Sequence, residues 1–179
     1  MKRTLTVILI SSAMLASGMG MLSSAPEPVP AACILLDESL KSVGQTDYRL
    51  EEGLSIPLND AGISVSSCDA YRSDDSLLMS FLIRQDVATD RNVVPSAQQL
   101  DDVLRDTAAA MGIDLQFEKL DGLGQASAWV GELGQIVSIN HDGRSVMNVG
   151  PGFVVEVSDA DKALAVDIVT HIVAAYPTM

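Results

Sequence analysis

Two stretches of alternating apolar and polar residues, joined through Asp142-Gly143, constrain the fold of this chain most strongly. They cover residues 135–149. Asp-Gly is a favoured dipeptide for the two-residue turn of a β-hairpin. Such a turn pairs Ile139 with Val146 on one face and Asn140 with Ser145 on the other. We therefore expect two antiparallel strands with one apolar and one solvated face.

Further segments have the composition of β-strands, with apolar residues that alternate or run continuously between turn residues. They are 46–58, which is typical of a broken strand, 63–71, 77–83, 115–120, 126–130, and 153–157, which either extends the hairpin or forms another strand. Ser73-Asp74-Asp75 separates 63–71 from 77–83, so these two are expected to form a first hairpin. Hairpins rather than helical crossovers thus join the strands, which favours an antiparallel sheet.

Three segments have the apolar spacing of amphipathic helices. The first covers 34–43 and ends at Gly44. The second begins at Ser96, where Gln99 completes a capping box, and ends at Gly112. Ser158 caps the third helix, and Pro177 ends it. Asp101 and Arg105 are spaced to pair across one turn of the second helix. The order helix, strands, helix, strands, helix predicts an α+β fold, an antiparallel sheet with helices packed on one face.

The amino terminus has the pattern of an export signal. Lys2 and Arg3 precede an uncharged run from residue 4 to 22, and small residues follow it. A retained membrane anchor is the competing interpretation, since nineteen uncharged residues nearly span a bilayer. Serines and glycines dilute the run, however, which favours cleavage, with the best site after Ala31. We therefore assign residues 1–31 to a signal peptide and its cleavage region, and 32–179 to a single α+β domain.

Only two cysteines are present, Cys33 and Cys68. An exported chain meets an oxidising compartment, where an even pair is expected to form a disulfide. The alternative is a lipoprotein anchored through Cys33, but Pro30-Ala31-Ala32 lacks the leucine-like residue usual three positions upstream of the lipidated cysteine. A disulfide is favoured and lipid attachment disfavoured, and either places the protein outside the cytoplasm, in the periplasm or secreted.

The strong negative charge of the chain argues against polyanions as its partners. The formal net charge is −13, and removal of residues 1–31 leaves nine basic and 23 acidic residues, a net charge of −14. Nucleic acid and anionic membrane surfaces repel such a protein. After signal cleavage no segment remains for a stable integral membrane domain. The acidic residues are scattered, as is typical of a solvated surface.

The sequence contains no recognisable catalytic or metal-binding pattern. His171 follows Asp167 by four residues on the last helix, which predicts an exposed contact, and no nucleophile is identified for His141. Neither histidine has a zinc-ligand spacing to a cysteine. Gly122-Leu123-Gly124 lacks the rest of a dinucleotide-binding fingerprint. Trp129 is expected in the core. We therefore predict no catalytic residues, metal or cofactor, and favour a protein that is not an enzyme.

Several short motifs resemble a family of small exported bacterial proteins, many of them lipoproteins, that form a domain family of unknown function. The matching motifs are Cys33-Ile34-Leu35-Leu36-Asp37-Glu38 with Gly44, Cys68-Asp69-Ala70-Tyr71, Gly122-Leu123-Gly124-Gln125-Ala126, and a terminal helix over 163–176. Ser39-Leu40 and Gln125 depart from the family pattern, which more often has Ala-Glu and aspartate there. The resemblance implies an exported α+β domain with a Cys33–Cys68 disulfide, and it implies no catalysis.

These observations predict an exported, non-enzymatic domain that binds a small ligand or a protein partner in the cell envelope. Two alternatives remain open. One is a hydrolase whose site is assembled from residues distant in sequence, including His141. The other is an inhibitor of an extracellular enzyme that makes contact through residues 86–95.

Overall fold

The structure is a computed structural model that describes residues 31–60, 62–86, 97–112, 116–141, 143–151 and 157–176. The helices are α1 (Ala32–Ser42), α2 (Ala97–Met111), the short 3₁₀ helix η1 (Gly131–Leu133) and α3 (Asp159–Ala175). The strands are β1 (Arg49–Ile56), β2 (Ile63–Tyr71), β3 (Leu77–Asp86), β4 (Phe117–Leu120), β5 (Ala126–Val130), β6 (Gln135–Ile139) and β7 (Ser145–Gly150). Several predicted features lie outside the described residues: residues 1–30 of the predicted signal segment 1–31, the Ser96 cap, strand residues 153–156 and Pro177.

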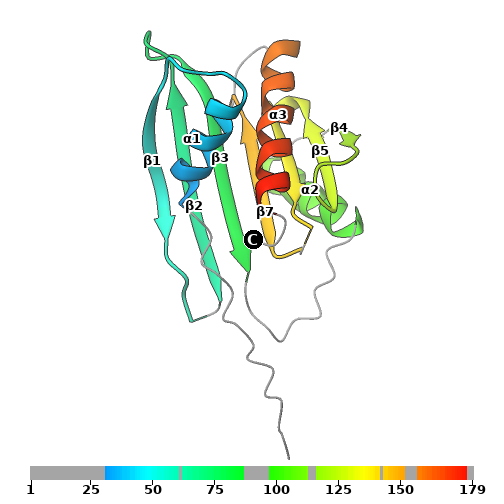
Figure 1. Cartoon of the computed structure of the whole chain (residues 1–179). Coiled ribbons are helices and arrows are strands. Elements are labelled where there is room, and N and C mark those ends of the chain that lie inside the picture. The colour runs from blue at the N-terminus through cyan, green and yellow to red at the C-terminus, as the bar shows by residue number, and fades with distance from the viewer. Residues whose placement is uncertain are drawn as a thin grey trace, which may run out of the picture.

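The strands form one seven-stranded sheet in the order β1-β2-β3-β7-β6-β5-β4. Every neighbouring pair is antiparallel. Two meanders, β1-β2-β3 and β4-β5-β6-β7, therefore share a single ladder between β3 and β7 (Figure 1). The predicted α+β class with an antiparallel sheet is confirmed.

The hairpin that constrained the fold has the predicted register but not the predicted wet face. Ile139 pairs with Val146, and the Asn140 amide donates to the Ser145 carbonyl at 2.9 Å. Asn140 and Ser145 are nevertheless completely buried. The Asn140 side chain satisfies its polar groups by donating to the Tyr176 carbonyl at 2.9 Å and accepting from the His141 amide at 2.8 Å. Burial without these bonds would be costly.

Two helices cover one face of the sheet, and the third lies on the other (Figure 1). α1 and α3 contact each other and pack on the first face, around Phe81, Ile136 and Met147. Leu100 and Leu104 of α2 pack on the opposite face, against five buried side chains: Ala128, Val130, Leu133, Val137 and Ile139. The expectation that all helices share one face is therefore wrong for α2. Its physical reason is that β5 and β6 carry apolar side chains on both faces, so both need cover.

Polar contacts fix the start of α3 and the surface of α2. The predicted cap of α3 is confirmed as a capping box: Asp161 N donates to Ser158 Oγ, and Ser158 N donates to the Asp161 carboxylate, both at 3.2 Å. On α2 the predicted pair is wrong, because Arg105 contacts Asp102 at 3.0 Å, while Asp101 lies 3.4 Å from Lys119 of β4. Such exposed pairs add little stability.

Candidate functional site

The predicted disulfide between Cys33 and Cys68 is present, with a sequence separation of 35 residues. It joins the first turn of α1 to β2, where Cys68 is completely buried. Beside it, the Ala32 amide donates to Ser66 Oγ at 3.0 Å, so two bonds hold the start of α1 on the sheet. The disulfide is compatible with an exported protein. Within the described ranges, no helix is long and apolar enough to cross a membrane.

The Gly122-Leu123-Gly124 motif has a structural role. Gly124 has φ +89°, and a Cβ there would overlap the Ile139 carbonyl oxygen. The Leu123 carbonyl accepts hydrogen bonds from two buried hydroxyls, that of Ser138 at 2.6 Å and that of Ser127. These bonds satisfy serines that the sheet encloses, which accounts for the motif without a nucleotide.

The two histidines lie at separate places in the fold, and neither lines the cleft described below. His141 is exposed at the turn between β6 and β7, where its carbonyl accepts from the Gln125 side chain at 3.1 Å. His171 is half-buried on α3. Trp129 is 9% exposed and belongs to the core, as expected, with the Lys162 ammonium 5.6 Å from its ring centre. No group of three or more metal-ligating side chains occurs among the residues that the structure describes.

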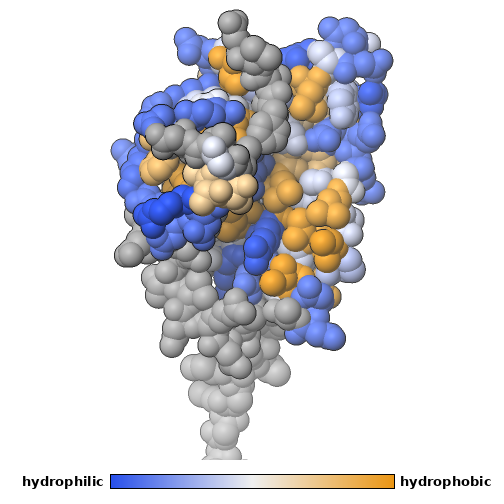
Figure 2. Space-filling model, turned by 180° about the vertical axis from the view of Figure 1, so that it is seen from behind, coloured by the Kyte–Doolittle hydropathy of each residue, from blue (hydrophilic) through white to orange (hydrophobic). Residues whose placement is uncertain are grey.

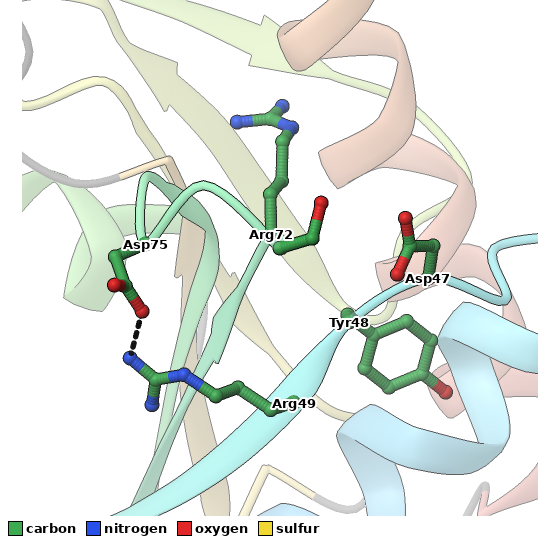
Figure 3. A pocket seen from close by; sticks show the side chains of 6 residues that line it. Asp47, Tyr48, Arg49, Arg72 and Asp75 are labelled. Atoms are coloured by element: carbon green, nitrogen blue, oxygen red, sulfur yellow. Dashed lines mark hydrogen bonds and ion pairs between the residues drawn. The ribbon is translucent and has the colours of Figure 1, made fainter.

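A cleft of about 240 Å³ lies where β1 begins beside the turn between β2 and β3 (Figure 3). It is lined by Asp47, Tyr48, Arg49, Arg72, Ser73 and Asp75. The turn is tight, because the Arg72 amide donates to the Ser76 carbonyl at 2.8 Å and Asp75 adopts φ +64°. The turn is predicted from the sequence but the cleft is not, because residues 47–49 at the start of β1 lie more than 20 positions before the turn residues that they face.

The cations of the cleft are already paired. Arg49 contacts Asp75 at 2.9 Å (Figure 3) and Glu51 at 3.1 Å, and its guanidinium lies 4.5 Å from the centre of the Tyr71 ring. The bonds to Asp75 and then Glu51 raise the pKa of Arg49. Arg72 donates to the Leu77 carbonyl at 3.0 Å and lies 3.7 Å from Asp161 of α3. Ion pairs and hydrogen bonds within the protein therefore hold the two arginines of the cleft, and the charges that line it largely neutralise one another.

Tyr48 connects the cleft to α1. Its hydroxyl donates to the Asp37 carboxylate at 2.8 Å, and Lys41 donates to the same group at 2.6 Å. The Lys41 bond, then the Tyr48 bond, lower the pKa of Asp37. Burial, then the Asp37 bond, raise the pKa of Tyr48 to about 12. Both shifts mean that the fold favours a neutral phenol on Tyr48 and a charged carboxylate on Asp37.

Stability should consequently fall in strong alkali. The protonated phenol of Tyr48 stabilises the fold fully below pH about 10, the pKa of an unfolded tyrosine, and this contribution is lost as pH rises through about 12. In an ultraviolet titration of phenolate absorbance, Tyr48→Phe should remove a transition near pH 12. Asp37→Asn should move that transition toward lower pH, while Tyr71→Phe, the matched control, should leave it in place. A transition that survives Tyr48→Phe would contradict the assignment.

The half of the sheet formed by β1, β2 and β3 has one face that α2 does not cover. In the sheet register Ile56 lies opposite Val65. Leu82, Asn148 and Val137 form one row across β3, β7 and β6, and α2 covers this row only at Val137. We define the open half-sheet as Ile56, Ile63, Val65 and Leu82, with Leu54 and Leu58 beside it at the edge. Figure 2, a view from behind, shows apolar side chains gathered over this half.

The exposure of this surface is unusual for apolar side chains. Leu54 is 53%, Ile56 39% and Leu58 57% exposed, and Ile63, Val65 and Leu82 are half-buried. An exposed patch of this kind commonly marks an interaction site. The spacing of Leu54, Ile56 and Leu58 predicts one apolar face on a strand. It does not reveal that, among the described helices, α2 covers this side of the sheet only over β5 and β6.

Comparison with known proteins adds no assignment: no family model, no curated protein and no solved structure matches this chain. The resemblance to exported domains of unknown function therefore stays a prediction.

Proposed function

We propose that this protein is an exported, non-enzymatic domain that binds a protein partner in the cell envelope through the open half-sheet. The observation that carries the proposal is the clustering of exposed apolar side chains, Leu54, Ile56 and Leu58, on and beside β1. Protein interfaces place such side chains at their centre and exclude water from them.

A small ligand receives less support from the cleft. Asp75, Glu51 and Asp161 already pair with the two arginines that line it, so a ligand would have to displace bonds within the protein. A volume of about 240 Å³ is also below the usual range of small-molecule sites, which begins at about 300 Å³. A protein partner that contacts the exposed side chains of Leu54, Ile56 and Leu58 breaks none of these ion pairs.

A hydrolase is also less well supported. Ser73 and two carboxylates line the cleft at the start of β3, but His141 lies in the turn beyond the end of β3. At that end of β3, the Asp86 amide donates to the backbone carbonyl of Arg144, which belongs to the same turn as His141, at 2.8 Å. A ten-residue strand spans about 30 Å, which is far beyond the reach of a general base. Residues 87–95 of the loop considered for an inhibitor lie outside the described residues.

The location outside the cytoplasm rests on two observations. The amino-terminal segment has the charge and apolarity of an export signal, and the Cys33–Cys68 disulfide is a bond that an oxidising compartment maintains. The negative charge of the chain favours a neutral or basic protein as the partner.

Site-specific photo-crosslinking tests the proposal. A crosslinking amino acid at Leu54 or Ile56 of the full chain, expressed in its exporting host, should yield a discrete protein adduct. Two controls are matched in exposure to the test positions. Ile34 is 52% exposed and matches Leu54 at 53%, and Phe117 is 39% exposed and matches Ile56 at 39%. Ile34 lies on α1 and Phe117 on the opposite edge strand, and neither should yield that adduct. Equal labelling from all four positions, or from none, would contradict the proposal.

A further inference from the structure

We infer that the partner binds by adding an extended, basic segment to the free edge of β1, pairing with Arg49–Glu52 and placing its apolar side chains on the open half-sheet. The inference rests on the proposed function and deepens it, because it specifies the chemistry of the partner and the geometry of its binding.

β1 offers an edge with which an added strand can pair. β1 is the terminal strand of the sheet, with a described strand, β2, on one side only. Seven of its eight residues are exposed, and Leu50 is half-buried. A strand edge presents backbone donors and acceptors that an extended peptide can pair with, and this mode of recognition derives affinity from the main chain and specificity from alternate side chains.

The irregularity in β1 limits where pairing can occur. The register shifts between Glu52 and Ser55, and the Leu54 amide there donates to Ser67 Oγ at 2.7 Å instead of continuing a regular ladder. An added strand can therefore pair regularly with the residues before the bulge, 49–52. Beyond it, the partner meets the exposed side chains of Leu54 and Ile56, so backbone pairing and apolar contact adjoin one another.

Charge selects the partner. Glu51 and Glu52 are both exposed on this edge, and Asp69 lies opposite Glu51 on β2. Arg49, the one cation of the strand, is engaged by Glu51 and Asp75. Glu51 and Asp69 lie on the face of the open half-sheet and Glu52 lies on the opposite face. When the apolar side chains of the added segment lie on the open half-sheet, its alternate lysine or arginine side chains therefore lie beside Glu52. A second copy of this chain would instead bring two acidic edges and two net charges of −13 together, which like-charge repulsion opposes.

A defined peptide tests the inference. The probe is a capped, alternating Lys-Val peptide of eight residues, added to the full chain, with binding measured by titration and its location by amide hydrogen exchange. We expect slower exchange within Arg49–Glu52 and in no other strand edge. A peptide of the same length with Glu in place of Lys should bind at least about tenfold more weakly, and N-methylation of alternate backbone amides should abolish the protection.

Charge-reversal variants localise the effect. The double variant Glu51→Lys with Glu52→Lys should weaken binding of the Lys-Val peptide at least about tenfold. Asp121→Lys with Asp167→Lys changes the net charge equally, at exposed positions on the loop before β5 and on α3, and should change binding less than about twofold. Equal weakening by both double variants would show that attraction is non-specific and would overturn the inference.

The outcomes separate this inference from the proposed function. If Leu54 yields a partner adduct in the host but the Lys-Val peptide leaves the β1 amides unprotected, strand addition is wrong and the proposed function stands. Failure of the host crosslink contradicts the proposed function itself. A dimer in sedimentation that protects the β1 amides without peptide would show that a second copy is the occupant, which would also overturn the inference.

Discussion

Loss of the Cys33–Cys68 disulfide is expected to lower the free energy of unfolding by about 4 kcal/mol, since it closes a loop of 35 residues in the unfolded chain. For a chain of this size such a change lowers the melting temperature by roughly 10 °C. The measurement is chemical denaturation of the native protein and of Cys33→Ala, Cys68→Ala and the double variant.

The double cysteine variant serves as the control for the two single variants. Each single variant removes the same cross-link, so the two losses should not add, and the double variant should resemble either one. A reducing agent should destabilise the native protein and leave the double variant unchanged. If reduction has no effect on the native protein, the disulfide contributes no stability, and the first turn of α1 is held by the Ala32–Ser66 hydrogen bond and apolar packing alone.

Gly150→Ala is expected to destabilise the protein by about 3 kcal/mol or more, because the added methyl group has no space. A Cβ at this position would overlap the Gly134 carbonyl oxygen and lie 2.6 Å from the Gln135 Cα. Both are backbone atoms at the start of β6, so relief requires that β6 and β7 move apart. Thermal denaturation measures the loss, which should lower the melting temperature by roughly 10 °C.

The matched control is Gly131→Ala. The nearest atom to a Cβ there is Trp129 Nε1 at 3.8 Å, an ordinary van der Waals distance, and the change should stay within about 0.5 kcal/mol. Similar melting temperatures for Gly150→Ala and the native protein would contradict the close approach of β7 to the turn before β6.

Local signals account for the parts of the fold that could be predicted. The Asp-Gly dipeptide predicts the register in which Ile139 pairs with Val146, and the spacing of Ser158 and Asp161 predicts the cap of α3. The cysteine pair was predictable because an exported chain with two cysteines has one pairing. Each of these features depends on chemistry within a few residues or on composition alone.

The features that escaped prediction depend on contacts between distant segments. α2 has one apolar stripe, and the sequence does not say which face of the sheet it covers. Asn140 and Ser145 are polar, yet they are buried because the end of α3 supplies the Tyr176 carbonyl as a partner. The open half-sheet likewise depends on the position of α2, which packs on β5 and β6 and does not extend over the same face of β2 and β3 in the described part of the chain.

The single ladder between the two meanders has a consequence for how the chain folds. Within each meander, strands that follow one another in sequence pair, so each can form through short loops. The ladder that joins them pairs Ser80 with Gly150, a closure of much longer range that should form later. Both cysteines belong to the first meander and its helix, so a chain that emerges amino terminus first into an oxidising compartment, as proposed above, can form its disulfide before the second meander arrives. Until then the β3 edge is unprotected, which makes the interval before β7 docks the stage at which this protein is most prone to misassociate.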